Sequence, residues 1–125
     1  MDKPVIMLVD DLQVVGGVVK SILEGTYEVK TFTSGKEALE YLSDHSVDLI
    51  LLDYEMPVMT GYEVLMAIRA DKRFSKVPVI FLTAVTNERL EAEMLERGAS
   101  DYVCKPIDAA VLRQRVQKHL SSAVK

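Results

Sequence analysis

The sequence lacks the features of proteins that reside in an oxidising compartment or a membrane. Cys104 is the single cysteine among 125 residues, so no internal disulfide can form, and this composition is typical of a reducing cytoplasm. The apolar runs are short, as in LILL at residues 49–52, and fall far below the roughly 20 residues that a membrane helix needs. The first residues also lack the charged and then apolar pattern of a signal peptide. We therefore expect a cytoplasmic protein with no membrane contact.

An excess of positive charge is absent as well. The 15 lysines and arginines are outnumbered by 19 aspartates and glutamates, which gives a formal net charge of −4. Proteins that bind nucleic acid or anionic lipid directly usually carry a basic surface, so we expect neither as a partner. The sequence also shows no repeat, low-complexity stretch or linker. A hydrophobic fraction of 49% over this length fits one globular domain, which we expect to span residues 1–125.

Two kinds of segment alternate along the chain. Short runs rich in β-branched and aliphatic residues predict strands at 5–9, 28–32, 49–52, 79–82 and 101–104. The segments between them carry apolar residues three or four positions apart, which is the spacing of an amphipathic helix. Five strands alternating with five helices indicate an α/β fold with a parallel sheet covered on both faces. Among the topologies that right-handed crossovers allow, the doubly wound, flavodoxin-like strand order 2-1-3-4-5 suits this length.

Local signals agree with most of these helices. Ser34 precedes Glu37 by three residues, the arrangement of a helix-capping box, and Gly98 is a natural helix stop. The first helix is the weakest prediction, because adjacent Gly16 and Gly17 each cost about 1 kcal/mol relative to alanine in a helix interior. We still predict a helix there, because its apolar residues keep to one face.

Polar side chains gather where four of the predicted strands end. Asp10 and Asp11 follow the first strand, and Asp53, Thr83 and Lys105 stand at the ends of the third, fourth and fifth. In the order 2-1-3-4-5 these strands are neighbours, and open α/β sheets bind ligands at the carboxyl ends of their strands. We therefore expect the three acids, the hydroxyl and the amine to face one crevice.

The chemistry of this set suggests phosphoryl transfer onto Asp53. Three close carboxylates raise each other's pKa unless a cation binds, and a set without His or Cys favours Mg²⁺ over a transition metal. Lys105 supplies a compact positive charge for a phosphoryl oxygen, and Thr83 can donate a hydrogen bond to it. In a purely structural alternative the acids cap helices and Lys105 pairs with one of them. The shared position at one sheet edge favours the chemical interpretation.

Four motifs in a fixed order carry a family resemblance. They are DD at 10–11, LLDYEMPVMTG at 51–61, LTA at 82–84 and DYVCKP at 101–106. With these motifs the chain resembles the response-regulator receiver domains of two-component signalling, the CheY-like family, over essentially its whole length. The resemblance implies the flavodoxin-like receiver fold and a signalling switch rather than an enzyme that turns over an external substrate.

The resemblance also assigns the residues of a phosphorylation site. Asp53 would be the phosphoacceptor. Asp10 and Asp11 would hold Mg²⁺ together with Asp53 itself and the backbone carbonyl of Glu55. Glu55 and Val85 would occupy positions that tune dephosphorylation.

Further roles follow from the resemblance near the last two strands. Thr83 and Lys105 would contact the phosphoryl group. Tyr102 would be the aromatic switch residue that moves with Thr83, and the Lys105–Pro106 peptide bond would be cis.

The resemblance implies partners as well. A sensor histidine kinase or a histidine phosphotransfer protein would donate the phosphoryl group. Phosphorylation would change the surface of the fourth helix, fifth strand and fifth helix, through which receivers form homodimers or bind targets. An output domain could follow the last residue, and PIDAAVLRQRVQKHL at 106–120 has a weak similarity to receivers that precede cyclic-di-GMP-processing domains.

Two other functions are alternatives to a switch. A pseudo-receiver would bind a protein partner and take up no phosphate. A phosphohydrolase of the haloacid dehalogenase type also uses a strand-end aspartate, but it needs a DxD motif where this chain has DDLQ at 10–13. That type also needs a cap domain, for which the chain is too short.

Three potentially reactive side chains fall outside these motifs. We expect Cys104 to pack in the core. His45 and His119 are isolated on helical segments, and we expect both to be solvated.

Overall fold

Five parallel strands form one sheet in the order β2-β1-β3-β4-β5, which confirms the predicted doubly wound α/β fold. The structure is a computed structural model that describes residues 3–84 and 87–124, so Val85 lies outside the described residues. The strands are β1 (Val5–Val9), β2 (Glu28–Phe32), β3 (Leu49–Asp53), β4 (Val79–Thr83) and β5 (Asp101–Cys104). The helices are α1 (Gln13–Leu23), α2 (Gly35–Leu42), α3 (Gly61–Ala70), α4 (Glu88–Glu96) and α5 (Ala109–Val124), with a short 3₁₀ helix, η1 (Lys72–Phe74), before β4.

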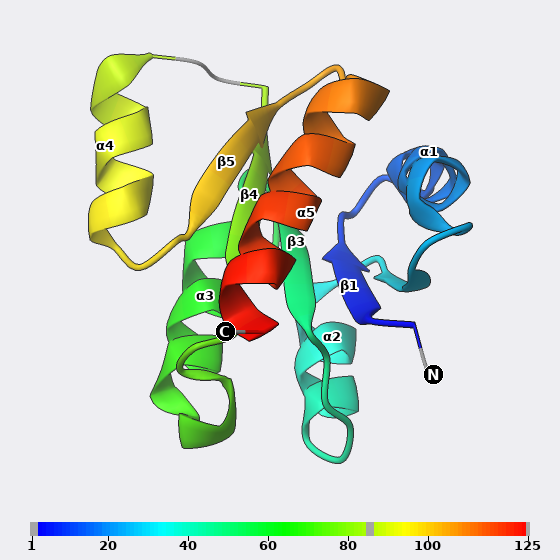
Figure 1. The fold of residues 1–125 in the computed structure, drawn as a ribbon. Helices are drawn as coiled ribbons and strands as arrows, with labels where there is room; N and C mark the ends of the chain where they lie inside the picture. The colour runs from blue at the N-terminus through cyan, green and yellow to red at the C-terminus, as the bar shows by residue number, and fades with distance from the viewer. Residues whose placement is uncertain (1–2, 85–86, 125) are drawn as a thin grey trace.

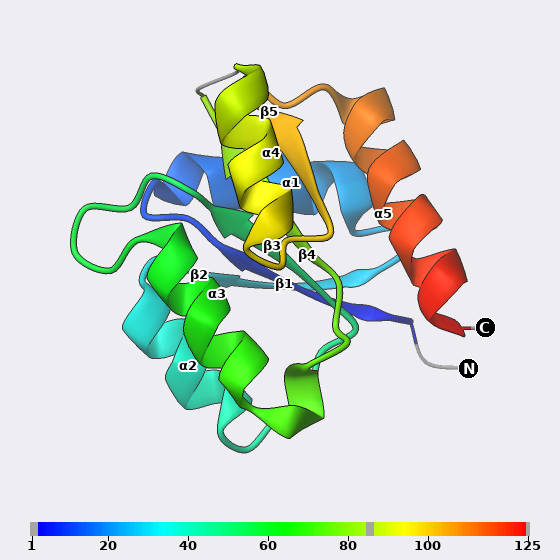
Figure 2. The ribbon, with the colours of Figure 1, turned by 90° about the vertical axis from the view of Figure 1, so that its left-hand side faces the viewer.

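Helices cover both faces of the sheet (Figures 1 and 2). Side chains of α2, α3 and α4 pack with one face of the sheet in a single apolar cluster, and α1 and α5 pack with the other face in a second cluster. Each fully buried aliphatic side chain contributes roughly 1.5–3 kcal/mol to folding, so the two clusters dominate the stability of the sheet. No helix among the described residues is both long and apolar enough to cross a membrane.

Strand β3 lies at the centre of the sheet and is buried on both faces. Its apolar residues, Leu49–Leu52, are 0% exposed, as expected for a central strand between two helical layers. Both β3 and β4 extend one residue beyond the predicted strands, to Asp53 and Thr83. The two polar side chains therefore belong to the ends of regular strands rather than to loops.

Helix α1 forms despite its two glycines. Val19 and Leu23 are buried against the sheet, and this packing outweighs the poor helix propensity. Gly16 faces β2, where an added Cβ would lie 3.4 Å from Thr31 Cγ2, whereas a Cβ on Gly17 would meet no atom within 4 Å. The two glycines thus have different surroundings although they are adjacent.

Side-chain caps define the starts of the other helices. The Ser34 hydroxyl accepts a hydrogen bond from Glu37 N at the start of α2, as predicted. Thr60 and Glu63 form a full capping box at the start of α3. Gly98 ends α4 with a φ of 111°, a conformation that favours glycine.

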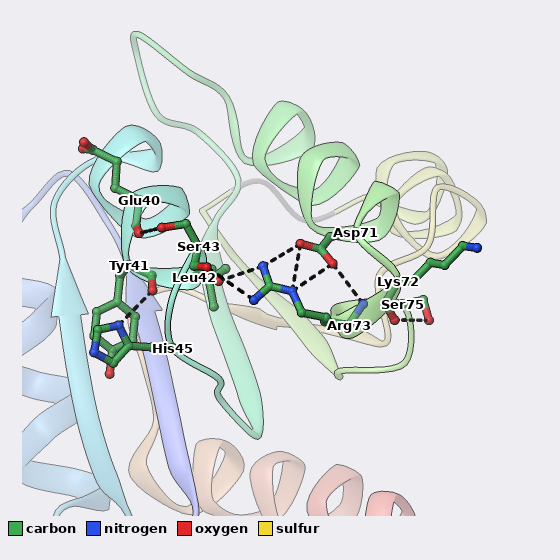
Figure 3. A network of polar contacts seen from close by, with 9 residues as sticks. All are labelled: Glu40, Tyr41, Leu42, Ser43, His45, Asp71, Lys72, Arg73 and Ser75. Carbon is green, nitrogen blue, oxygen red and sulfur yellow. Dashed lines mark hydrogen bonds and ion pairs between the residues drawn. The ribbon is translucent and has the colours of Figure 1, made fainter.

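A polar network at the carboxyl end of α2 connects the α2–β3 loop with the segment between α3 and β4 (Figure 3). Arg73 in η1 pairs with Asp71 at 2.8 Å and donates a hydrogen bond to the Leu42 carbonyl at 3.0 Å. His45 stacks on the Tyr41 ring with centroids 4.0 Å apart. These contacts hold the α2–β3 loop against the segment that leads into β4.

Two minor predictions are wrong. Cys104 is exposed, because it is the last residue of β5, a strand at the edge of the sheet. His119 is mostly buried, with Nε2 2.9 Å from Asp101 Oδ2. The helical pattern placed His119 correctly on α5 but could not show that an acid on β5 faces it.

Candidate functional site

The site is built around Asp53, the last residue of β3. Its side chain follows four fully buried residues and is itself only 2% exposed. A backbone hydrogen bond from Tyr54 N to Leu82 O, 2.9 Å long, continues the pairing with β4 just past the carboxylate. The strand therefore holds Asp53 in a fixed position.

Gly61 allows the next segment to pack directly on this strand end. A Cβ at this position would overlap the Asp53 carbonyl oxygen and would lie 2.8 Å from Tyr54 Cα. Only glycine permits this approach without moving the backbone. The start of α3 thus buttresses the backbone of Asp53.

Asp10 and Asp11 follow β1 and complete a cluster of three carboxylates. One oxygen from each of Asp10, Asp11 and Asp53 lies within 4.8 Å of the others. Asp10 is buried and its Oδ1 accepts a hydrogen bond from Leu12 N at 2.9 Å, whereas Asp11 is exposed at the mouth of the site. The structure therefore brings together the acids that the motifs placed at one sheet edge.

Lys105 supplies the positive charge of the cluster. Its Nζ lies 2.9 Å from Asp10 Oδ2 and 3.3 Å from Asp53 Oδ1. A hydrogen bond of 2.8 Å from Lys105 N to Thr83 O aligns this residue with the end of β4, and the Lys105–Pro106 peptide bond is cis. Burial lowers the pKa of Lys105, but its contacts with Asp10 and Asp53 outweigh burial and raise the pKa overall.

The carboxyl group of Asp53 is strained electrostatically. Burial raises its pKa to about 6, and repulsion from Asp10 and hydrogen bonding with the Asp11 carboxyl act in the same direction. A hydrogen bond from Glu55 N, 3.2 Å long, and the charge of Lys105 oppose the shift. One ammonium therefore does not fully compensate for the clustered acids.

The donor set fits a divalent cation that prefers oxygen ligands. Asp10 Oδ2 is buried and accepts no hydrogen bond of good geometry among the described residues, although Lys105 Nζ lies close to it. Buried carboxylate oxygens normally have a hydrogen-bond donor or a metal. Three carboxylates without His or Cys match the preference of Mg²⁺.

Glu55 makes a contact that the sequence did not reveal. Its Oε1 accepts a hydrogen bond of 3.1 Å from Thr83 Oγ1 and another of 2.9 Å from Ala84 N. Thr83 is completely buried, whereas the Glu55 side chain is exposed. One side of the site is thus closed by a carboxylate from the β3–α3 loop.

Tyr102 is connected to α4. It pairs with Phe81 across β4 and β5, and its ring packs partly buried on the face that α2, α3 and α4 cover. A hydrogen bond to the Glu91 carboxylate raises the pKa of the Tyr102 phenol. Tyr102 therefore joins β5 to the helix that follows Thr83 in the chain.

Two further clusters lie at the opposite edge of the sheet, where β4 and β5 begin, and have no simple sequence signal. Asp101 on β5 contacts both Arg115 and His119 of α5, each at 2.9 Å. Arg69 on α3 donates to the carbonyls of Phe74, Val77 and Gly98. The first cluster joins α5 to β5, and the second joins α3 to η1 and to the loops before β4 and β5. Hydrophobic periodicity does not predict how far such long side chains reach.

Comparison with known proteins agrees with this architecture. The chain is 41% identical over 117 residues to a probable cyclic di-GMP phosphodiesterase of Vibrio cholerae, covering 94% of this chain but 26% of that protein. It thus spans about a quarter of that relative's length. It is 33% identical to the chemotaxis protein CheY of Pseudomonas aeruginosa, covering 90% of this chain and 93% of CheY.

A solved structure extends the comparison to the site. The receiver domain of a sensor histidine kinase from Pseudomonas aeruginosa PAO1, with magnesium coordinated in its active-site cleft, superposes with a TM-score of 0.86. It is 31% identical in sequence, and the match covers 95% of this chain and 98% of that one. The sequence model of the family described as "response regulator receiver domain" matches residues 6–117. The chain therefore belongs to the response regulator receiver domain family, whose members are CheY-like switches of two-component signalling.

Proposed function

We propose that this chain is a switch that accepts a phosphoryl group on Asp53 from a histidine kinase or a histidine phosphotransfer protein. The observation that carries the proposal is a buried carboxylate paired with a cation, since Lys105 Nζ lies 3.3 Å from Asp53 Oδ1. A carboxylate held at the end of a buried strand is positioned for attack on phosphorus, and the ammonium offsets the negative charge that arrives. Residues 1–125 would act as one receiver domain in the cytoplasm.

The transfer would exchange one bond to phosphorus for another. An Asp53 oxygen forms a bond to phosphorus while the P–N bond of a phosphohistidine breaks, and the histidine nitrogen keeps the electron pair and takes up a proton. Asp53 becomes an acyl phosphate, and attack of water on phosphorus later returns the carboxylate and inorganic phosphate. A pKa of about 6 leaves Asp53 mostly ionised at pH 7 and able to attack.

Other residues would bind the transferred group and its counter-ion. Lys105 and Thr83 would contact phosphoryl oxygens. Asp10, Asp11, Asp53 and the backbone carbonyl of Glu55 would hold Mg²⁺, which when bound neutralises phosphoryl charge.

We assign the output to the surface of α4, β5 and α5. Leu95 on α4 and Val111 on α5 are large apolar side chains that are 46% and 36% exposed, which suits a protein contact. Within this surface, Tyr102 of β5 interacts with Glu91 of α4. A homodimer, a separate target or an attached output domain could use the surface. The Vibrio cholerae relative suggests that cyclic-di-GMP turnover is one process under such control.

Intact mass after incubation with acetyl phosphate and Mg²⁺ tests the proposal. The wild type should gain about 80 Da, the mass of one PO₃H unit. Asp53→Asn should gain nothing, and Glu40→Gln, which alters an exposed acid on α2, should behave like the wild type. Labelling should also require Mg²⁺.

The result that contradicts the proposal is a wild type with no adduct under conditions that preserve acyl phosphates. Beryllofluoride, which mimics the phosphoryl group without transfer, then separates two explanations. Binding of beryllofluoride would indicate a short-lived phosphoaspartate. Failure to bind it would support a pseudo-receiver that only contacts proteins.

A further inference from the structure

We propose that the Glu55 side chain is an internal anion that holds the donors of the phosphoryl site while Asp53 is unmodified. On this proposal, phosphorylation must displace Glu55 before the phosphoryl group can be fully bound. The inference rests on the proposed phosphorylation of Asp53 and adds a regulatory contact to it.

Two donors converge on a single oxygen of Glu55. Thr83 Oγ1 lies 3.1 Å from Oε1, and Ala84 N lies 2.9 Å from the same atom. A hydroxyl and a backbone amide aimed at one anionic oxygen form the arrangement that a phosphoryl oxygen needs. The Glu55 carboxylate therefore stands in for such an oxygen.

These donors cannot serve two acceptors fully. The Thr83 hydroxyl carries one hydrogen, and so does the Ala84 amide. If either donor turns to a phosphoryl oxygen on Asp53, it gives up its hydrogen bond to Glu55. The free energy of the Glu55 contacts is therefore subtracted from that of the phosphoryl contacts.

The surroundings of Glu55 favour its release once Asp53 is phosphorylated. Lys105 pairs with Asp10 and Asp53, and a phosphoryl group on Asp53 brings up to two negative charges close to Glu55. Like charges repel, and the exposed Glu55 side chain can turn into water without a desolvation penalty. Phosphorylation of Asp53 would therefore weaken the Glu55 contacts.

Release of Glu55 would also free the residue that follows β4. Ala84 is exposed and directly precedes the connection toward α4. Its amide is tied to the β3–α3 loop through the Glu55 carboxylate. Loss of that bond would relax the end of β4 on the side that leads to the proposed output surface.

The experiment uses the full chain with Glu55→Ala and Glu55→Gln, and with Glu40→Gln as a matched control for the loss of one carboxylate. The first measurement is the Ala84 amide proton resonance without Mg²⁺ or any phosphoryl mimic. The second is the affinity for beryllofluoride, formed from beryllium chloride and sodium fluoride, at saturating Mg²⁺. Intact-mass labelling with acetyl phosphate is recorded for every variant.

In Glu55→Ala we expect the Ala84 resonance to move upfield and beryllofluoride to bind about fivefold more tightly, as removal of one competing hydrogen-bond acceptor predicts. Glu55→Gln keeps an acceptor oxygen but loses the charge, so both effects should be smaller. Glu40→Gln should match the wild type in both measurements.

The inference is overturned if Glu55→Ala leaves the Ala84 resonance in place, or if it binds beryllofluoride no more tightly than the wild type. In that case, labelling of Asp53 in the wild type would still support the proposed function. If neither the wild type nor any variant binds beryllofluoride or takes up phosphate, the proposed function and the competition fail together.

Discussion

The ammonium of Lys105 lies 2.9 Å from a carboxylate oxygen of Asp10 whose side chain is only 1% exposed. This ion pair, with the second contact to Asp53, is the charge compensation that the described residues provide for the buried acids. The pair therefore contributes both to the chemistry of the site and to the stability of the fold.

Removal of the ammonium should expose this dual role. We expect Lys105→Ala to lower the free energy of unfolding by about 2–3 kcal/mol at pH 7 in EDTA, because Asp10 and Asp53 stay buried without a cation. Mg²⁺ should then raise the melting temperature of the variant more than that of the wild type. Urea and thermal unfolding provide the measurements, with Lys76→Ala as a control on an exposed lysine. Equal melting temperatures for Lys105→Ala and Lys76→Ala would contradict the expectation.

The raised pKa of Asp53 predicts a pH dependence of stability. Because its pKa is about 6 in the folded protein and 3.8 for an aspartate side chain free in water, folding favours the protonated form. Its favourable contribution is present below about pH 4 and is lost as pH rises through 6. At pH 7 without Mg²⁺, we expect Asp53→Asn to stabilise the protein by about 1–3 kcal/mol, with no gain near pH 4.

Urea unfolding at several pH values checks this prediction. Glu40→Gln serves as the control, since its stability profile should run parallel to that of the wild type. A profile of Asp53→Asn that also runs parallel to the wild type would show that the Asp53 carboxyl is not electrostatically strained.

Two glycines form a matched pair. We expect Gly61→Ala to destabilise the protein by about 2–3 kcal/mol and to slow labelling of Asp53, because the new Cβ forces the Asp53 backbone to move. Gly17→Ala should instead stabilise it by about 0.5–1 kcal/mol, since the Cβ meets open space inside a helix. Chemical denaturation measures both effects. The same sign for both variants would refute the close approach at Gly61.

The Arg69 guanidinium donates hydrogen bonds to three backbone carbonyl groups. Burial lowers the pKa of this guanidinium. We expect Arg69→Lys to lose about 1–3 kcal/mol of stability, because a lysine cannot reproduce the planar fork and leaves carbonyl groups without donors. Arg113→Lys, on the exposed side of α5, should be neutral. Thermal unfolding compares the two, and a neutral Arg69→Lys would contradict the role of the fork.

Much of the fold follows from patterns that the sequence displays directly. The strands are short aliphatic runs, and strict alternation with helices determines a parallel sheet, so β1 and β3 could be placed almost to the residue. The carboxyl ends of neighbouring parallel strands lie at one edge of the sheet, so the strand order alone brings Asp10, Asp53 and Lys105 together. Ligands of such sheets bind at this edge.

The remaining features depend on how far side chains reach in three dimensions. The contact of Glu55 with Thr83 depends on the course of the β3–α3 loop, which has no periodic pattern. The pairing of Asp101 with His119 joins residues on different elements, and neither residue carries a local signal of its partner. Cys104 was misplaced because the sequence of a four-residue strand does not reveal that the strand lies at the sheet edge with its last residue uncovered.

The complete burial of β3 places Asp53 on a well-protected central strand of the sheet. Amide hydrogens on such a strand exchange with solvent only in openings close to global unfolding, so Asp53 is attached to the slowest-exchanging segment of the sheet. Ala84, by contrast, is exposed just beyond the end of β4. Asp53 is therefore attached to a fixed support: if it is phosphorylated as proposed, its own strand would stay in place and the displacement would fall on the end of β4.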